Sequence, residues 1–147
     1  MYAWKTPPRI KVLEALGCIA DGRIKFIGDR EAIVVSSTGE RSYKVTWDGG
    51  KAIMSTDNGS LYRGYLGYPS IAFLMLKGVL PFDKRLADAL KGIPWKKLNE
   101  TYKKYKIVEE KVKVIAKERG VSPEELDRFV AKVMKAIREQ KFVKLEV

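Results

Sequence analysis

The sequence predicts an α+β fold, in which a small antiparallel β-sheet of about four strands packs with a buried helix and a C-terminal antiparallel helical hairpin. Three observations support this class. Short segments of alternating apolar and polar residues follow one another between residues 23 and 55. The segment Ile71–Leu76 is apolar throughout, and the last third of the chain has two amphipathic stretches at helical spacing. A chain of 147 residues is long enough to bury a core as one domain.

The first predicted element is a helix, and a meander of strands follows it. Apolar residues recur at helical spacing from Arg9 to Ala20, after which Asp21-Gly22 provides a stop. Turn sequences separate the four strand candidates, so an antiparallel meander is the simplest arrangement. The predicted strands are Arg23–Ile27, Ala32–Ser36, Arg41–Trp47 and Lys51–Ser55.

A loop rich in glycine and tyrosine, Leu61–Tyr68, separates the sheet from the most apolar helix candidate. Pro69 suits the first turn of that helix, which we expect to end at Lys77 before Gly78. Because this segment is apolar nearly all round, we predict that it is the central core helix.

The rest of the chain is predicted to be mainly helical. A short helix runs from Asp83 to Lys91, and a single long helix runs from Pro94 to Arg119. A capping box at Ser122-Pro123-Glu124-Glu125 begins the next helix, which makes residues 94–141 a helical hairpin. The tail, residues 142–147, alternates and is predicted to add an edge strand. We therefore divide the chain into a core of residues 1–92 and a hairpin of residues 93–147, packed as one unit.

Composition argues against several classes of function. The chain has no histidine, which excludes histidine general-base catalysis and an ordinary zinc site. The only cysteine, Cys18, lies among apolar residues, and we interpret it as structural. No apolar run is long enough to cross a bilayer, and the N-terminus lacks the apolar core of a signal peptide. We expect a cytoplasmic protein with no membrane partner, and its many Lys and Glu residues are typical of thermophilic composition.

Positive charge is concentrated in the C-terminal part. The net charge is +11, and residues 61–147 carry twenty basic and eleven acidic side chains, against nine and seven in residues 1–60. An excess of one sign favours association with polyanions.

Residues 43–80 run through two strands, a glycine-containing loop and an apolar helix, an order that resembles the SWIM-type zinc finger. Where that family places its cysteine and histidine ligands, this chain has Met54, Thr56, Tyr68 and Ser70. These do not form a zinc-binding set. The resemblance therefore implies a degenerate SWIM-like module without metal, in which Met54 and Tyr68 replace a zinc-centred core by packing. It also implies binding to nucleic acid or protein, the role suggested for the family.

Two stretches are candidates for binding nucleic acid. The loop from Tyr62 to Tyr68 interleaves tyrosines with Arg63 and two glycines, a composition that can stack bases and admit a phosphate. Its alternative role is structural, with rings packed on the sheet and glycines that permit the turn. The second stretch, Lys84–Lys113, has ten basic residues against four acidic ones. It is either a phosphate-binding surface or an ordinary solvated helix face.

No enzyme chemistry is indicated, and we expect neither a cofactor nor a metal. The carboxylates Asp48 and Asp57, the latter beside Asn58, are of a type that binds Mg²⁺, but such residues are also expected in turns. Neither a Walker-type phosphate loop nor a dinucleotide-binding GxGxxG sequence occurs.

The sequence therefore predicts a non-catalytic protein that binds DNA or RNA. The expected contacts to bases or backbone are Arg63, Tyr65 and Tyr68, and the expected phosphate contacts are Lys96, Lys97, Lys103 and Lys104. The alternative is a protein-interaction or dimerisation module, in which the long helix pairs with another chain, or a second copy, through Trp95, Leu98, Tyr102 and Tyr105.

Overall fold

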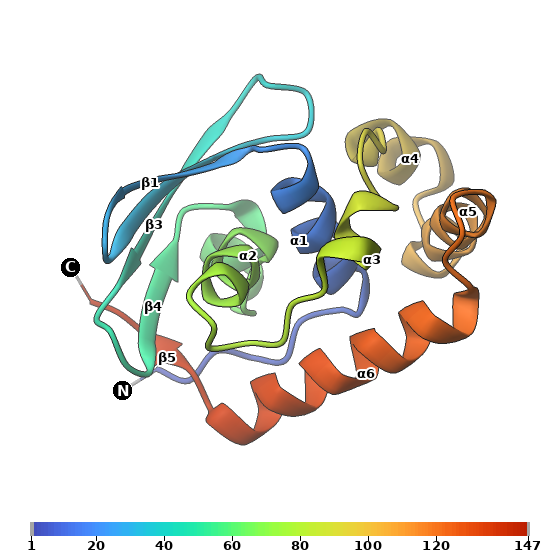
Figure 1. Cartoon of the computed structure of the whole chain (residues 1–147). Coiled ribbons are helices and arrows are strands. Elements are labelled where there is room, and N and C mark those ends of the chain that lie inside the picture. The colour runs from blue at the N-terminus through green and yellow to red at the C-terminus, as the bar shows by residue number, and fades with distance from the viewer. Residues whose placement is uncertain (1, 147) are drawn as a thin grey trace.

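The computed structural model describes residues 2–146, which form a five-stranded sheet packed against α-helices (Figure 1). The predicted α+β class is confirmed. The strands lie side by side in chain order: β1 (Ile24–Gly28), β2 (Glu31–Val35), β3 (Ser42–Trp47), β4 (Ala52–Ser55) and β5 (Val143–Lys144).

The sheet begins as the predicted meander. Strands β1 to β4 pair antiparallel, and each begins and ends within one residue of its predicted bounds. Strand β5 pairs parallel with β4, with Val143 opposite Ala52, so residues 143–144 add the edge strand predicted for the tail. The meander could be predicted because tight turns set its pairing locally.

Two helices form the centre of the core. Helix α2 (Tyr68–Leu76) packs against β1, β3 and β4, and α1 (Ile10–Ala20) packs against α2. Ile71, Phe73 and Leu74 of α2 are fully buried, which confirms its predicted place. A π-helical turn, η1 (Gly59–Arg63), precedes α2 and includes the first residues of the predicted loop.

The remaining helices are α3 (Lys84–Asp88), α4 (Trp95–Tyr102), α5 (Tyr105–Glu118) and α6 (Pro123–Gln140). Helix α6 crosses below α1 and returns the chain to the sheet (Figure 1). The predicted capping box is present, since Ser122 Oγ accepts from the Glu125 amide and the Glu125 carboxylate accepts from the Ser122 amide. No helix within residues 2–146 is long and apolar enough to cross a membrane.

The single long helix predicted over residues 94–119 is wrong. Helix α4 ends at Tyr102, Lys103 is left-handed with φ of 57°, and α5 begins at Tyr105. Trp95 and Val108 are both buried, but in one straight helix they would point about 140° apart, at about 100° of rotation per residue. The break lets α4 and α5 each turn its own apolar side toward the core.

Trp95 is buried because its indole lies directly on Gly17 of α1. A Cβ at Gly17 would lie 2.7 Å from the indole Nε1, closer than packed atoms tolerate. Gly17 is itself buried, in the middle of α1. The absence of a side chain there is therefore what allows α4 to approach α1.

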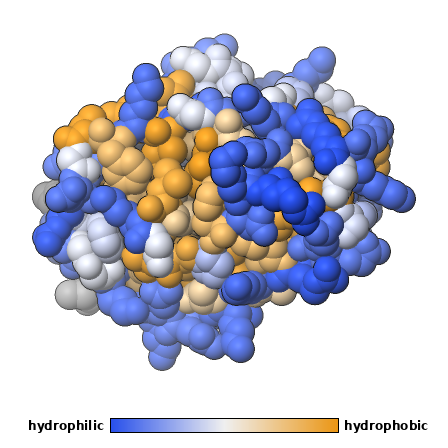
Figure 2. All heavy atoms as spheres, in the orientation of Figure 1, coloured by the Kyte–Doolittle hydropathy of each residue, from blue (hydrophilic) through white to orange (hydrophobic). Residues whose placement is uncertain are grey.

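One face of the molecule is apolar. Figure 2 shows apolar residues gathered over the sheet and α2, while polar residues cover the helices on the right. Phe26 packs on Phe73 with 5.0 Å between ring centres, and Lys77 covers both rings. Ile27 is nevertheless 59% exposed and Leu76 is 40% exposed.

The contact between α1 and α4 predicts the effect of Gly17→Ala. The added methyl group must displace the Trp95 indole, so we expect a loss of about 1–3 kcal/mol in unfolding free energy, measured by urea denaturation. Gly28→Ala is the control, because nothing lies within 4 Å of its Cβ position. A Gly17→Ala variant as stable as this control would contradict the packing described.

Candidate functional site

A polar pocket of about 410 Å³ opens between the β2–β3 turn, α1, the start of η1 and α4. Its volume lies in the range of small-molecule sites. It is lined by charged, hydroxyl and aromatic side chains, with four basic and four acidic residues among them. The basic residues are Lys11, Arg23, Arg41 and Lys96, and the acidic residues are Glu14, Glu40, Asp57 and Glu100.

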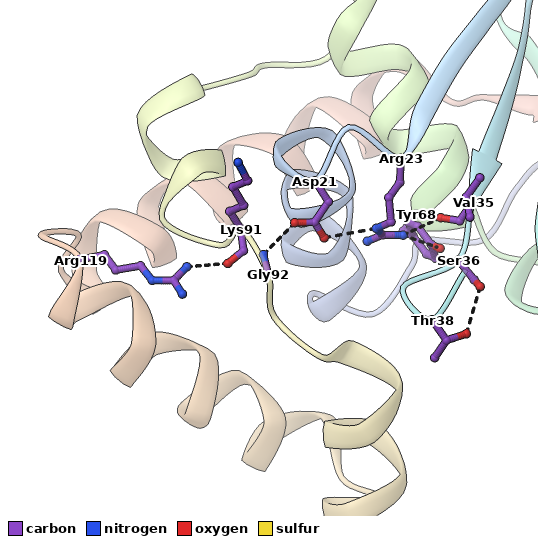
Figure 3. Close-up of polar contacts among 9 residues, drawn as sticks. All are labelled: Asp21, Arg23, Val35, Ser36, Thr38, Tyr68, Lys91, Gly92 and Arg119. Carbon is purple, nitrogen blue, oxygen red and sulfur yellow. Dashed lines mark hydrogen bonds and ion pairs between the residues drawn. The ribbon is translucent and has the colours of Figure 1, made fainter. Parts of the chain in front are cut away.

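One wall of the pocket is a tyrosine held by an arginine (Figure 3). Arg23 Nη1 donates to the Val35 carbonyl at 2.8 Å and to the Tyr68 hydroxyl at 3.4 Å. Burial raises the pKa of Tyr68 well above its ordinary value, so this phenol stays neutral. Tyr43 meets Tyr68 edge to face with 6.4 Å between ring centres.

Arg23 is in turn fixed by Asp21. The Asp21 carboxylate accepts from Arg23 Nε at 3.3 Å and from the Gly92 amide at 2.7 Å (Figure 3). Arg119 donates to the Lys91 carbonyl beside Gly92 at 2.7 Å. These contacts connect the pocket wall to the segment between α3 and α4 and to the end of α5.

The inner side of the pocket carries a buried ion pair. Lys11 Nζ donates to Glu14 Oε2 at 3.0 Å, and Asn99 Nδ2 donates to Glu14 Oε1 at 3.2 Å. Only 5% of the Glu14 side chain and 14% of the Lys11 side chain are exposed. Burial lowers the pKa of Lys11, but the Glu14 carboxylate together with the Tyr65 and Tyr105 hydroxyls outweighs this effect, and the pKa lies above its ordinary value. Lys11 is therefore charged at neutral pH.

Asp57 accepts hydrogen bonds from several groups of the neighbouring chain segments. Its carboxylate accepts from Ser55 Oγ at 2.5 Å, from Ser60 Oγ at 2.8 Å and from the Ser60 amide at 3.2 Å. The Gly67 backbone approaches so closely that a Cβ there would meet this carboxylate. Asp57 thus links β4, η1 and the start of α2.

The predicted loop residues lie at different depths. Arg63 is exposed in η1, Tyr65 is half-buried, and Tyr68 forms part of the pocket wall. Burial, together with the neighbouring Tyr105, raises the pKa of Tyr65 to about 12. Its ring lies directly against Gly59, where there is no room for a Cβ. This part of the loop therefore has the structural role that was its alternative, with a tyrosine packed against a glycine.

The four predicted phosphate contacts, which we call the α4 lysines (Lys96, Lys97, Lys103 and Lys104), are all exposed. Lys96 stands at the pocket, with Glu40 at 3.4 Å and Glu100 at 3.9 Å. Within residues 2–146, the other three form no ion pair. Tyr105 follows Lys104 directly, and Lys11 lies 5.3 Å above its ring. This contact and the neighbouring Tyr65 place the start of α5 near the pocket.

The structure adds pocket residues that the sequence analysis did not single out: Lys11, Glu14, Arg23, Arg41 and Asn99. Of these, Glu14 carried a detectable signal. It lies four residues after Ile10, on the apolar side of a short helix, where an acid is unexpected. The others come from distant parts of the chain, and their convergence has no local signature.

The SWIM-like positions are occupied by side chains that bond within the chain. Thr56 Oγ1 accepts from the Lys44 amide at 3.0 Å, and Ser70 Oγ donates to Ser55 Oγ at 3.0 Å. Within residues 2–146 no cluster of three or more His, Cys, Asp or Glu residues is placed to hold a metal ion.

Comparison with known proteins gives one match. A family model described as "Uncharacterised conserved protein UCP014422" matches residues 4–143, which include every pocket residue. No curated protein and no solved structure matches the chain.

The buried ion pair predicts a large effect of Glu14→Leu. Lys11 then keeps its charge with no partner, so we expect a loss of about 3–5 kcal/mol in unfolding free energy by urea denaturation. The double variant Lys11→Met/Glu14→Leu should recover most of this loss. Glu139→Leu, at the exposed pair with Lys135, is the control and should change stability by at most about 1 kcal/mol. Equal losses of stability for Glu14→Leu and Glu139→Leu would contradict the burial of the Lys11–Glu14 ion pair.

Proposed function

We propose that this chain, which belongs to the family described as Uncharacterised conserved protein UCP014422, binds nucleic acid without catalysing a reaction. The observation that carries the proposal is the set of exposed lysines next to the pocket. Lys97, Lys103 and Lys104 form no ion pair with any of residues 2–146, although the chain has 18 acidic residues. Cations that no acid neutralises are free to replace the counterions of a phosphate backbone.

The geometry around the break between α4 and α5 supports a single-stranded ligand. The left-handed Lys103 turns the chain there, and Lys104 precedes Tyr105, whose side chain is 45% exposed. An exposed aromatic ring beside a cation is the combination that single strands use, with bases stacked and phosphates paired. The deeper pocket lies alongside, with Lys96 at its edge.

The remaining predicted contacts keep their proposed roles. Arg63 is exposed and is proposed to contact the backbone, and Tyr65 offers the uncovered part of its ring. Tyr68 is mostly buried and lies in the pocket wall, so it is proposed to contact a base that enters the pocket. DNA and RNA both fit this description. The resemblance to the SWIM-type zinc finger also supports binding to nucleic acid. We propose a cytoplasmic location for the protein.

The test is a triple charge reversal, Lys97→Glu/Lys103→Glu/Lys104→Glu. We expect affinity for a short labelled single strand to fall at least about tenfold, and the slope of log K against log salt to shrink by about 2, because three cations are lost. Fluorescence anisotropy at several salt concentrations measures both quantities.

The matched control is Lys25→Glu/Lys117→Glu/Lys132→Glu, which has the same net charge and reverses exposed lysines away from the pocket. It should lose much less affinity. Equal losses of affinity in the two triple variants would mean that only the overall charge matters. Unchanged affinity in the Lys97, Lys103 and Lys104 variant would overturn the proposal that these lysines bind nucleic acid.

A second candidate function is protein interaction or dimerisation. The exposed apolar residues over the sheet and α2 favour it, rather than the helix predicted over residues 94–119. Trp95 is only 3% exposed, so the Trp95–Tyr105 seam is not available as a whole. Ile27, in contrast, is 59% exposed, and Leu76 is 40% exposed. A dimer that persists at high salt in sedimentation and dissociates on Ile27→Asp would support this candidate, whereas a monomer at micromolar concentration would count against it.

A further inference from the structure

We propose that the pocket holds one unpaired nucleotide of the bound strand and prefers bases that carry an exocyclic amino group. This inference rests on the proposed function and names the part of the ligand that enters the protein. The cavity of about 410 Å³ gives a planar base room beside its sugar, and its entrance adjoins the α4 lysines through Lys96.

The outer part of the pocket suits a phosphate. Arg41 is exposed there, and its guanidinium forms no ion pair within residues 2–146. The neighbouring turn supplies hydroxyl groups from Ser36, Ser37 and Thr38, and Figure 3 shows Ser36 and Thr38 on the same side as Tyr68. A guanidinium presents paired N–H donors that match the oxygens of a phosphate.

The wall suits a base. Tyr43 and Tyr68 contact each other edge to face, with an angle of 89° between their planes, so the two rings offer surfaces in two directions. Both belong to fixed elements, and Arg23 holds the Tyr68 hydroxyl. A rigid aromatic wall stacks bases of any sequence and therefore does not itself select among them.

The inner side supplies the selectivity. The Glu14 carboxylate can only accept hydrogen bonds, so Asn99 must turn its amide nitrogen toward it, as the 3.2 Å contact records. Asn99 Oδ1 is thereby left buried, and no donor within residues 2–146 reaches it. Asn99 lies in the pocket wall, and in the proposed complex its side chain rotates so that Oδ1 accepts from a donor of the ligand.

An exocyclic amino group provides that donor. Adenine and cytosine carry one where uracil and thymine present a carbonyl oxygen, and guanine carries one at a different position. A carbonyl oxygen placed there would face the Glu14 carboxylate and Asn99 Oδ1. The nearby donors are engaged elsewhere, because Lys11 is paired with Glu14 and the Trp95 indole N–H, which has no hydrogen-bond partner among the described residues, lies against Gly17. Discrimination thus comes from one gained hydrogen bond and from repulsion of the wrong base.

The experiment compares single-stranded oligonucleotides that differ at one central position in an otherwise constant uridine strand, by fluorescence anisotropy at low salt. We expect adenine or cytosine at that position to bind at least about fivefold more tightly than uracil, the worth of one hydrogen bond. Purine, which is adenine without its amino group, should bind like uracil. This comparison requires no altered protein, so a folding defect cannot obscure it.

Two variants locate the effect. Asn99→Ala should reduce the preference for adenine over purine to less than about twofold. Asn58→Ala is the matched control, because Asn58 lines the same pocket but is exposed and makes no side-chain cap bond. It should keep the full preference, and thermal unfolding of both variants confirms that they are folded.

The outcomes separate this inference from the function on which it rests. Strands that bind with equal affinity whatever the central base would overturn the pocket preference and leave nucleic-acid binding intact. If no strand binds but adenosine monophosphate binds more tightly than uridine monophosphate and depends on Asn99, the pocket preference stands and the proposed function fails. If neither strands nor monophosphates bind, both are wrong.

Discussion

The contact of Trp95 with Gly17 is the constraint on which the arrangement of the C-terminal half depends. Because α1 has no side chain at Gly17, the indole lies directly on its backbone and brings α4 against α1. Residues one turn further along α4 then face the side chains of α1, and Asn99 reaches Glu14. The chain then turns at the left-handed Lys103, after which α5 buries a different side. A packing contact in the core thus shapes the inner side of the pocket.

Polar contacts hold the pocket in place from three sides. Asp21 joins Arg23 to the Gly92 amide, Asp57 joins β4 to the start of α2, and Glu14 joins α1 to α4. Donors of this chain already occupy these three carboxylates. The groups left for a ligand are Arg41 and the turn hydroxyls, Lys96 with the exposed Glu40 and Glu100, and the buried Asn99 Oδ1. Trp95 Nε1 is also buried without a hydrogen-bond partner in residues 2–146, against Gly17. This distribution, more than the pocket's balanced charge, distinguishes it from a simple anion site.

Much of the fold could be predicted because its determinants are local. Tight turns set the meander, and Ser122 with Glu125 sets the start of α6. The break at Lys103 could not be predicted, because the apolar positions from Trp95 to Ala116 keep a helical spacing that is interrupted only at Glu109. The separate burial of Trp95 and Val108 arises only in the folded chain. The candidate site was predicted in part: the α4 lysines and Tyr68 were named from composition, whereas Arg41 and Asn99 come together only in the folded chain. Glu14 is the one pocket residue that a helical pattern exposes as unusual.

The salt dependence of binding by the unaltered protein tests the central claim, that lysines left unpaired beside the pocket bind nucleic acid. A labelled single strand titrated at about 50 and 200 mM salt should bind at micromolar or lower concentration and lose about 20-fold in affinity, because neutralising about three phosphates of a single strand gives a slope near −2. Affinity that is unaffected by salt, or no binding at the lower salt concentration, would contradict the claim.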